Sequence, residues 1–130
     1  MEAKMKIGIV GLGMVGHAVQ AGMTNLGHEI SYHDPKYRTN LKDVLESEIC
    51  FICVPTPSKE DGSCDTHIVV ETIKDLILYG YKGIIAIKST VEPGTTSSLQ
   101  KLYNTHRICF VPEFLRERFA IADFVDEHDL

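Results

Sequence analysis

Apolar residues gather in five short runs along the chain, and each run has the length of a single β-strand. The runs lie at about residues 5–10, 29–33, 49–54, 83–88 and 107–111. Runs of this length, rich in Ile, Val and Phe, are typical of strands buried in a sheet. The run at 49–54 is apolar at almost every position, as expected for a strand covered on both faces.

The segments between these runs repeat apolar residues at helical spacing. Asp65 or Thr66 is a candidate N-cap for one of them. Because strands that alternate with helices form right-handed crossovers, the pattern predicts an α/β protein. We expect a Rossmann-type, doubly wound, mostly parallel sheet that forms one domain over residues 1–130. Helices are predicted over residues 15–26, 69–77 and about 95–103, with a short one over 41–46.

A glycine-rich turn follows the first predicted strand and opens the first predicted helix, in the order Gly11-Leu12-Gly13-Met14-Val15-Gly16. This is the G-x-G-x-x-G pattern of dinucleotide-binding domains in its expected strand–turn–helix setting. Gly11 permits the tight turn, Gly13 lets the backbone approach a pyrophosphate, and Gly16 allows close packing of helix on strand. The helix N-terminus presents free N–H groups to the anion. Gly11, Gly13, Met14, Val15 and Gly16 are therefore candidate cofactor-binding residues.

Asp34 ends the second apolar run, eighteen residues after Gly16. An acidic residue at this distance accepts hydrogen bonds from the adenosine ribose in dinucleotide-binding domains. Its negative charge also repels a 2′-phosphate. The sequence therefore predicts NAD as the cofactor in preference to NADP.

Size and charge restrict the partners. A chain of 130 residues with 44% hydrophobic and 24% charged residues is typical of one globular domain. A net charge of −5 argues against nucleic acid as a partner. A membrane span needs about 20 apolar residues, and no apolar stretch of the chain approaches that length. The N-terminus also lacks a signal-peptide pattern. We therefore expect a cytoplasmic protein with no membrane partner.

The four cysteines do not suggest a metal site. Cys50 and Cys53 form C-x-x-C, but side chains three positions apart on a strand point to opposite faces. Cys50, Cys53 and Cys109 are therefore interpreted as small buried apolar residues. Cys64 lies in a polar segment and is expected to be a free thiol, and the histidines show no ligand spacing.

Polar residues follow the later strands. Thr56 follows the third, Thr90 the fourth, and Glu113 and Glu117 the fifth. Ligands bind just outside these carboxyl ends in open α/β sheets. A partly buried Glu113 would have a raised pKa, suitable for a general base. The simpler interpretation is that the threonines end strands or cap helices and that the two glutamates form a solvated pair.

These segments carry a family resemblance over most of the chain, from Lys6 to about Phe124. The chain resembles the UDP-glucose/GDP-mannose dehydrogenase family, whose successive motifs agree with it in order and spacing. Besides the glycine turn, the matching motifs are Val54-Pro55-Thr56-Pro57 with Asp61-Gly62 and Asp65, Lys88-Ser89-Thr90-Val91 with Pro93-Gly94-Thr95, and Pro112-Glu113-Phe114-Leu115-Arg116-Glu117.

The resemblance implies oxidation of a nucleotide sugar's C6 alcohol to a carboxylate with two NAD⁺ and a cysteine thiolate that holds the intermediate. By position, Thr56 and Thr90 would line the cofactor and active-site edge, and Thr90 would help to place a water molecule. Glu113 would act on that water or in proton transfer, and Glu117 would border the nicotinamide. Arg116 could meet an anionic ligand or form a surface ion pair.

Two departures from the family pattern limit these implications. Only about fourteen residues separate Asp34 from the third predicted strand, where family members carry a longer insertion. The family's C-terminal domain, with its nucleophilic cysteine, has no counterpart before Leu130. We therefore expect a chain that binds NAD but completes the oxidation only with the missing domain or a partner chain.

Two alternatives stay open: a stand-alone NAD-binding module, or an NAD(P)-dependent domain of the β-hydroxyacid dehydrogenase type. Self-association into a homodimer is also left open.

Overall fold

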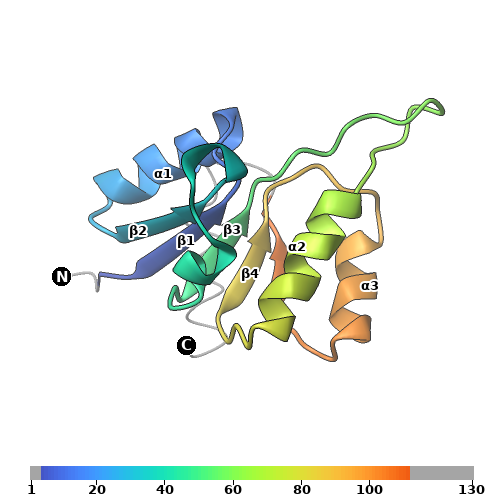
Figure 1. Cartoon of the computed structure of the whole chain (residues 1–130). Coiled ribbons are helices and arrows are strands. Elements are labelled where there is room, and N and C mark those ends of the chain that lie inside the picture. The colour runs from blue at the N-terminus through green and yellow to red at the C-terminus, as the bar shows by residue number, and fades with distance from the viewer. Residues whose placement is uncertain (1–3, 112–130) are drawn as a thin grey trace.

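The computed structural model describes residues 4–111, which form a single parallel sheet with helices on both faces (Figure 1). The strands are β1 (Lys6–Val10), β2 (Glu29–His33), β3 (Ile49–Ile52), β4 (Ile84–Ile87) and β5 (Ile108–Phe110). The helices are α1 (Met14–Asn25), α2 (His67–Leu78) and α3 (Thr95–Leu102), with two short 3-10 helices, η1 (Pro35–Tyr37) and η2 (Leu41–Val44).

The strand order is β2-β1-β3-β4-β5, and each neighbouring pair is parallel. The chain leaves β1 to form β2 on one side and then returns to form β3 on the other side. This reversal creates a crevice at the carboxyl ends of β1 and β3, where ligands bind in doubly wound sheets. The predicted α/β fold of Rossmann type is confirmed.

Two apolar layers hold the helices on the sheet. Val19 of α1 packs with Ile9 and Phe51 on one face of the sheet. On the other face, residues of α2 and α3 such as Ile73 and Leu99 belong to a second cluster. Figure 1 shows α1 on one side of the sheet and α2 with α3 on the other. The central strands are therefore buried on both faces, as the continuous apolar runs predicted.

The predicted orientation of the C-x-x-C pair is confirmed. Cys50 belongs to the cluster under α2 and α3, whereas Cys53 packs against the cluster under α1. Cys50 is fully buried, while Cys53 and Cys109 are half-buried. Cys64 is a free thiol, as expected.

Some predicted boundaries were wrong. β3 ends at Ile52, two residues before the predicted end, and Pro55, which follows soon after, has no N–H for a ladder. The predicted short α-helix is the 3-10 helix η2, closed by a capping box between Asn40 and Asp43.

The predicted cap of α2 is divided between two residues. Thr66 occupies the N-cap position without a side-chain hydrogen bond. The carboxylate of Asp65 accepts the hydrogen bond from the His67 amide at 2.9 Å.

The connection between β2 and β3 is short and closely packed. It contains η1 and η2 and no strand. A Cβ at Gly8 of β1 would lie 2.6 Å from the Ser47 hydroxyl oxygen and 3.0 Å from Val44 Cβ. Only glycine at this position lets the connection lie so close to the sheet. No helix within residues 4–111 is long and apolar enough to cross a membrane.

Candidate cofactor site

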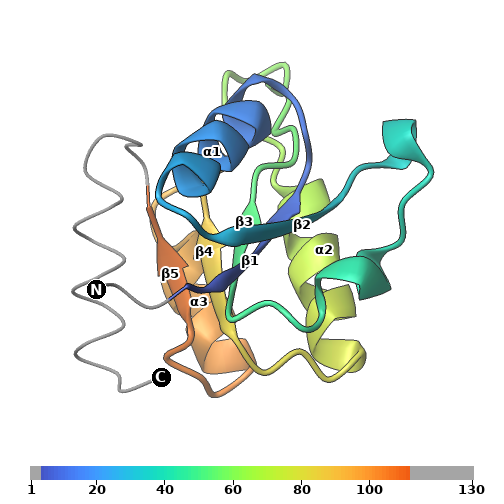
Figure 2. The same cartoon turned by 90° about the vertical axis from the view of Figure 1, so that its left-hand side faces the viewer.

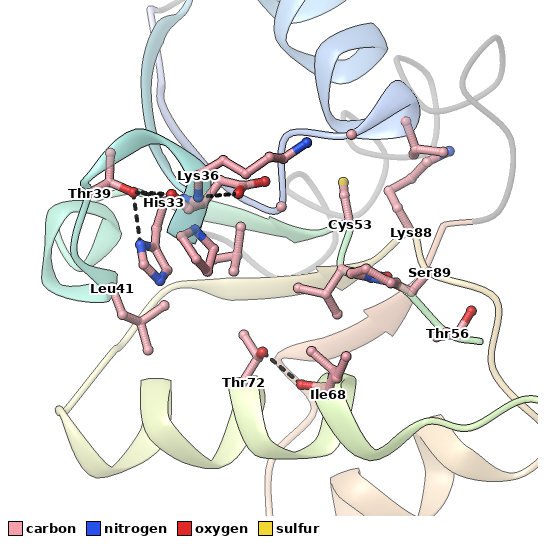
Figure 3. A pocket seen from close by; sticks show the side chains of 18 of the residues that line it. His33, Lys36, Thr39, Leu41, Cys53, Thr56, Ile68, Thr72, Lys88 and Ser89 are labelled. Carbon is pink, nitrogen blue, oxygen red and sulfur yellow. Dashed lines mark hydrogen bonds between the residues drawn. The ribbon is translucent and has the colours of Figure 1, made fainter.

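A cleft of about 930 Å³ opens at the carboxyl ends of β1 and β3, a size within the usual range for small-molecule sites (Figure 3). It is lined by the glycine loop, by the end of β2 with the segment after it, by the segments after β3 and β4, and by one side of α2. In Figure 3, Leu41 lies across the cleft from Ile68 and Thr72 of α2.

The three glycines of the loop have different surroundings. Gly11 has a φ of +95°, and a Cβ there would lie 2.7 Å from the Cys53 carbonyl oxygen. A Cβ on Gly16 would overlap the Gly11 carbonyl oxygen. At Gly13 a Cβ would meet no atom within 4 Å, and Gly13 lines the cleft. Gly11 and Gly16 are therefore needed by the fold itself, whereas Gly13 leaves space in the cleft that a ligand can use.

The N-terminus of α1 faces this space. Within the described residues, the first α1 amide with a helical acceptor is that of His17, which donates to the Gly13 carbonyl at 3.0 Å. The amides before it have no acceptor in the helix. No side chain of residues 4–111 caps this end by a hydrogen bond, and the first turn of α1 holds no acidic residue. The helix end is therefore suited to hold a phosphate.

Asp34 is buried, with 7% of its surface exposed, and it lines the cleft. Its Oδ2 accepts a hydrogen bond from the Leu12 amide at 2.7 Å and its Oδ1 accepts one from the Lys36 amide at 2.9 Å. Burial alone would raise its pKa, but the hydrogen bonds from Lys36 and Leu12 and the charge of Lys36 leave that pKa below its usual value. Asp34 is therefore ionised and fastens the glycine loop to the segment after β2. Each oxygen keeps a lone pair for a further donor.

A histidine that the sequence reasoning did not select also lines the cleft. The Thr39 hydroxyl can donate to the Asp34 carbonyl oxygen at 3.0 Å and accepts a hydrogen bond from the Asp34 amide at 2.7 Å. The same oxygen lies 2.9 Å from His33 Nδ1. Which of these two atoms donates depends on the tautomer of His33. Figure 3 shows this pair at the Leu41 side of the cleft.

The two threonines predicted from the strand ends both line the cleft. Thr56 is half-buried and Thr90 is exposed. The buried Ser89 hydroxyl donates a hydrogen bond to the Val54 carbonyl oxygen at 2.7 Å. This hydrogen bond joins the segments after β3 and β4, so it holds the two threonines on one rim.

Cys53 lines the cleft, but its thiol is not activated. Burial raises its pKa to about 12, although the nearby positive charge of Lys88 acts in the opposite direction. A thiol with this pKa is protonated near neutral pH and is a poor nucleophile. In the described part of the chain, no group of three or more His, Cys, Asp and Glu side chains could hold a metal ion.

The structure brings most of the predicted site residues together. Gly11, Gly13, Met14, Val15, Asp34, Thr56 and Thr90 line the cleft. Gly16 does not line it and is buried in the first turn of α1, against the Gly11 carbonyl. Glu113, Arg116 and Glu117 lie outside the described residues. The sequence reasoning missed the α2 side of the cleft, which is lined by Ile68, Thr72, Asp75 and Tyr79.

The fold and this cleft define a dinucleotide-binding domain of Rossmann type. The model of the UDP-glucose/GDP-mannose dehydrogenase family, NAD binding domain, matches residues 35–129, and the chain belongs to this family. Its cofactor is NAD. The matched region begins after Asp34, so it does not include the glycine loop. The loop geometry and the family match therefore support the same cofactor from different parts of the chain.

The named relatives of the chain are UDP-glucose dehydrogenases. The UDP-glucose 6-dehydrogenase of Streptococcus pneumoniae is 41% identical over 83 residues, which cover 63% of this chain and 20% of that enzyme. The UDP-glucose 6-dehydrogenase of Rickettsia bellii is 29% identical over 160 residues, covering 93% of this chain and 37% of that enzyme. A UDP-glucose dehydrogenase structure from Pyrobaculum islandicum has a TM-score of 0.63 at 23% identity, covering 86% of this chain and 36% of that one.

The chain differs in length from these relatives in two ways. The chain spans no more than about two fifths of any of these relatives. The alignment with the Rickettsia bellii enzyme is longer than the 130-residue chain itself, so that enzyme has residues inside the matched region that this chain lacks.

Proposed function

We propose that this chain is the NAD-binding part of a dehydrogenase that oxidises the C6 alcohol of a nucleotide sugar to a carboxylate with two NAD⁺. The observation that carries the proposal is the single cleft in which the open backbone at Gly13, the carboxylate of Asp34 and the threonines Thr56 and Thr90 meet. The named relatives are UDP-glucose dehydrogenases, which supports a UDP-sugar as the substrate.

The described residues suggest how the cofactor is held. The free amides at the start of α1 would hold the pyrophosphate beside Gly13, where no side chain intervenes. Asp34 would accept hydrogen bonds from the adenosine ribose through its remaining lone pairs. Bound NAD⁺ supplies the hydride acceptor for the oxidation.

The chemistry beside the cofactor would use the strand-end residues. Thr56 and Thr90 would line the edge that faces the substrate, and Thr90 would help to place the water used in hydrolysis. Glu113 would take part in proton transfer with that water, and Glu117 would border the nicotinamide. The last two assignments rest on the resemblance of their motif to the family.

Three of the four cysteines do not suit the thiolate chemistry of this reaction. Burial raises the pKa of Cys50 far above its usual value and that of Cys109 to about 11. Together with Cys53 they are protonated near neutral pH. We therefore propose that a C-terminal domain or a partner chain supplies the thiolate and completes the enzyme.

Substitution of Gly13 tests the cofactor site. The Gly13→Ala variant adds a methyl group where the cleft is open, so it should fold normally but obstruct the pyrophosphate. We expect NAD⁺ binding, measured by calorimetry, to weaken about tenfold or more, which corresponds to about 1.4 kcal/mol.

Thr24→Ala is the control, because it changes an exposed residue of α1 that lies outside the cleft lining. Its affinity for NAD⁺ should stay that of the unsubstituted chain. Equal affinities for all three proteins would contradict the proposed position of the pyrophosphate.

The choice of cofactor gives a second test. NADP⁺ would place its 2′-phosphate near the ionised Asp34, so it should bind about tenfold or more weakly than NAD⁺. Parallel calorimetric titrations at one salt concentration measure the ratio. A preference for NADP⁺ would instead favour a domain of the β-hydroxyacid dehydrogenase type.

A further inference from the structure

The strand β2 lies at one edge of the sheet with no element beyond it in the described part of the chain. Figure 2 shows β2 nearest the viewer, in front of β1, with no helix or strand crossing it. In the common Rossmann strand order another strand of the same chain lies beyond this one. Here the connection between β2 and β3 forms only η1 and η2, so no strand within residues 4–111 occupies that position.

The outward backbone groups of β2 belong to two residues. The Glu29 amide donates to the Met5 carbonyl at 2.9 Å, and the Gly11 amide donates to the His33 carbonyl at 2.8 Å. Because successive residues of a strand alternate in direction, Ile30 and Tyr32 direct their N–H and C=O groups away from β1. The five residues pair with β1 without a bulge and include no Pro or Lys, two devices that commonly protect an edge.

We propose that a second copy of this chain occupies this edge, with the two β2 strands antiparallel about a two-fold axis at Ser31. In this register Ile30 of each copy lies opposite Tyr32 of the other. These are the residues with outward backbone groups, so each pair can exchange both of its hydrogen bonds. The sheets of the two copies then become continuous, with the same patch used on both sides, as a two-fold dimer requires.

The side chains of β2 are complementary in this register. Glu29 lies opposite His33 of the second copy, which places a carboxylate beside an imidazole whose Nδ1 is already bonded to Thr39. On the other face Ile30 lies opposite Tyr32, and in each copy both pack against the apolar cluster under α1.

Moving the two-fold axis by one residue in either direction removes this side-chain complementarity. A two-fold axis at Ile30 would place Glu29 opposite Ser31. An axis at Tyr32 would place the Asp34 carboxylate opposite the apolar Ile30. The register centred on Ser31 therefore opposes acid with base and apolar with apolar.

The dimer keeps the two cofactor clefts apart. Because the two strands run in opposite directions, their carboxyl ends, where the clefts lie, are at opposite ends of the joined edge. Glu29 of the second copy would lie next to His33, which lines the cleft. The proposal rests on the edge strand and does not depend on the substrate or reaction proposed above.

Light scattering on a size-exclusion column tests the interface with the 130-residue chain. Ser31→Lys places two ammonium groups face to face at the axis, so it should convert a dimer to a monomer. Ser97→Lys changes an exposed serine of α3 and should leave the dimer intact. A monomeric unsubstituted chain, or a Ser31→Lys variant that folds and is still dimeric, would overturn the proposal.

Disulfide formation tests the register with a milder change. Residues directly opposite in a non-hydrogen-bonded antiparallel pair have Cα atoms about 4.5 Å apart, within disulfide range. Ser31→Cys should therefore give a covalent dimer on a non-reducing gel. In Glu29→Cys the two new thiols would be about 13 Å apart along the strands and should not cross-link. A cross-link through position 29, or none through position 31, would contradict this register.

Discussion

Asp34 connects the glycine loop to the end of β2 through a buried, ionised carboxylate. The sequence predicted this residue as a ligand of the ribose, from its distance to Gly16. The structure adds that both oxygens already accept backbone amides, those of Leu12 and Lys36. Asp34 is therefore needed to shape the site before any ligand binds.

This role predicts a pH-dependent loss of stability in Asp34→Asn. An amide can accept from one of the two backbone N–H groups but presents its own NH₂ to the other. We expect the free energy of unfolding at neutral pH to fall by about 1–3 kcal/mol.

The sign of the pH dependence follows from the lowered pKa of Asp34. A carboxyl with a lower pKa in the folded state stabilises the fold above its unfolded value of about 3.9, and this stabilisation is lost as the pH falls through the folded pKa. Urea unfolding of both proteins should therefore converge in strong acid. Asp75→Asn, an exposed carboxyl of α2, is the control and should change stability little. A constant difference across this pH range would contradict the prediction.

The sequence predicted one property of the cysteines and missed another. Strand alternation correctly placed Cys50 and Cys53 on opposite faces, because that alternation is a local property of the backbone. The place of Cys53 in the cleft was not predictable, because it depends on β3 ending at Ile52.

At the scale of elements, α1 is close to the glycine loop because residue 16 has no side chain. Gly16→Ala would force its methyl group into the Gly11 carbonyl oxygen, so helix and loop would have to separate. We expect a loss of about 1–3 kcal/mol in the free energy of unfolding.

Urea denaturation measures this loss, with Thr24→Ala, at an exposed position of the same helix, as the control. Alanine at an exposed helix position should not destabilise the fold. Gly16→Ala should also weaken NAD⁺ binding, whereas Gly13→Ala should affect binding alone. A Gly16→Ala variant as stable as the unsubstituted chain would show that the loop can move aside.

The sequence predicted the strands and α-helices of the described region to within a few residues at each end, because the strands are short apolar runs and because α1 and α2 repeat apolar residues at helical spacing. It was wrong about the segment 41–46. The 3-10 helix η2 forms there because Asn40 and Asp43 cap each other and because Gly8 leaves room for Val44 against β1. That space belongs to a different part of the chain, so no local pattern could reveal it.

At the scale of the molecule, we propose that a thiolate from a C-terminal domain or a partner chain completes the enzyme. The chain alone should bind NAD⁺ but form no NADH when given a UDP-sugar. Mixing it with an equimolar C-terminal domain of a UDP-glucose 6-dehydrogenase should restore NADH formation, followed by absorbance.

Failure of that mixture to form NADH, while NAD⁺ binding by the chain is intact, would contradict the proposed oxidation and favour a stand-alone NAD-binding module. The same C-terminal domain mixed with the Gly13→Ala variant is the control. It should form NADH more slowly at limiting NAD⁺, because only cofactor binding is weakened.

The sequence by itself determined the α/β fold, the turn and the helix start that suit a pyrophosphate, and the polar residues at strand ends. These follow from local backbone geometry and from apolar periodicity. Only the tertiary structure decided that α2 forms one side of the cleft, that His33 bonds Thr39, and that β2 is the outermost strand of the sheet formed by residues 4–111. Each of these depends on which distant segments pack together. The energy of that packing is shared among many residues, so no short stretch of sequence encodes it.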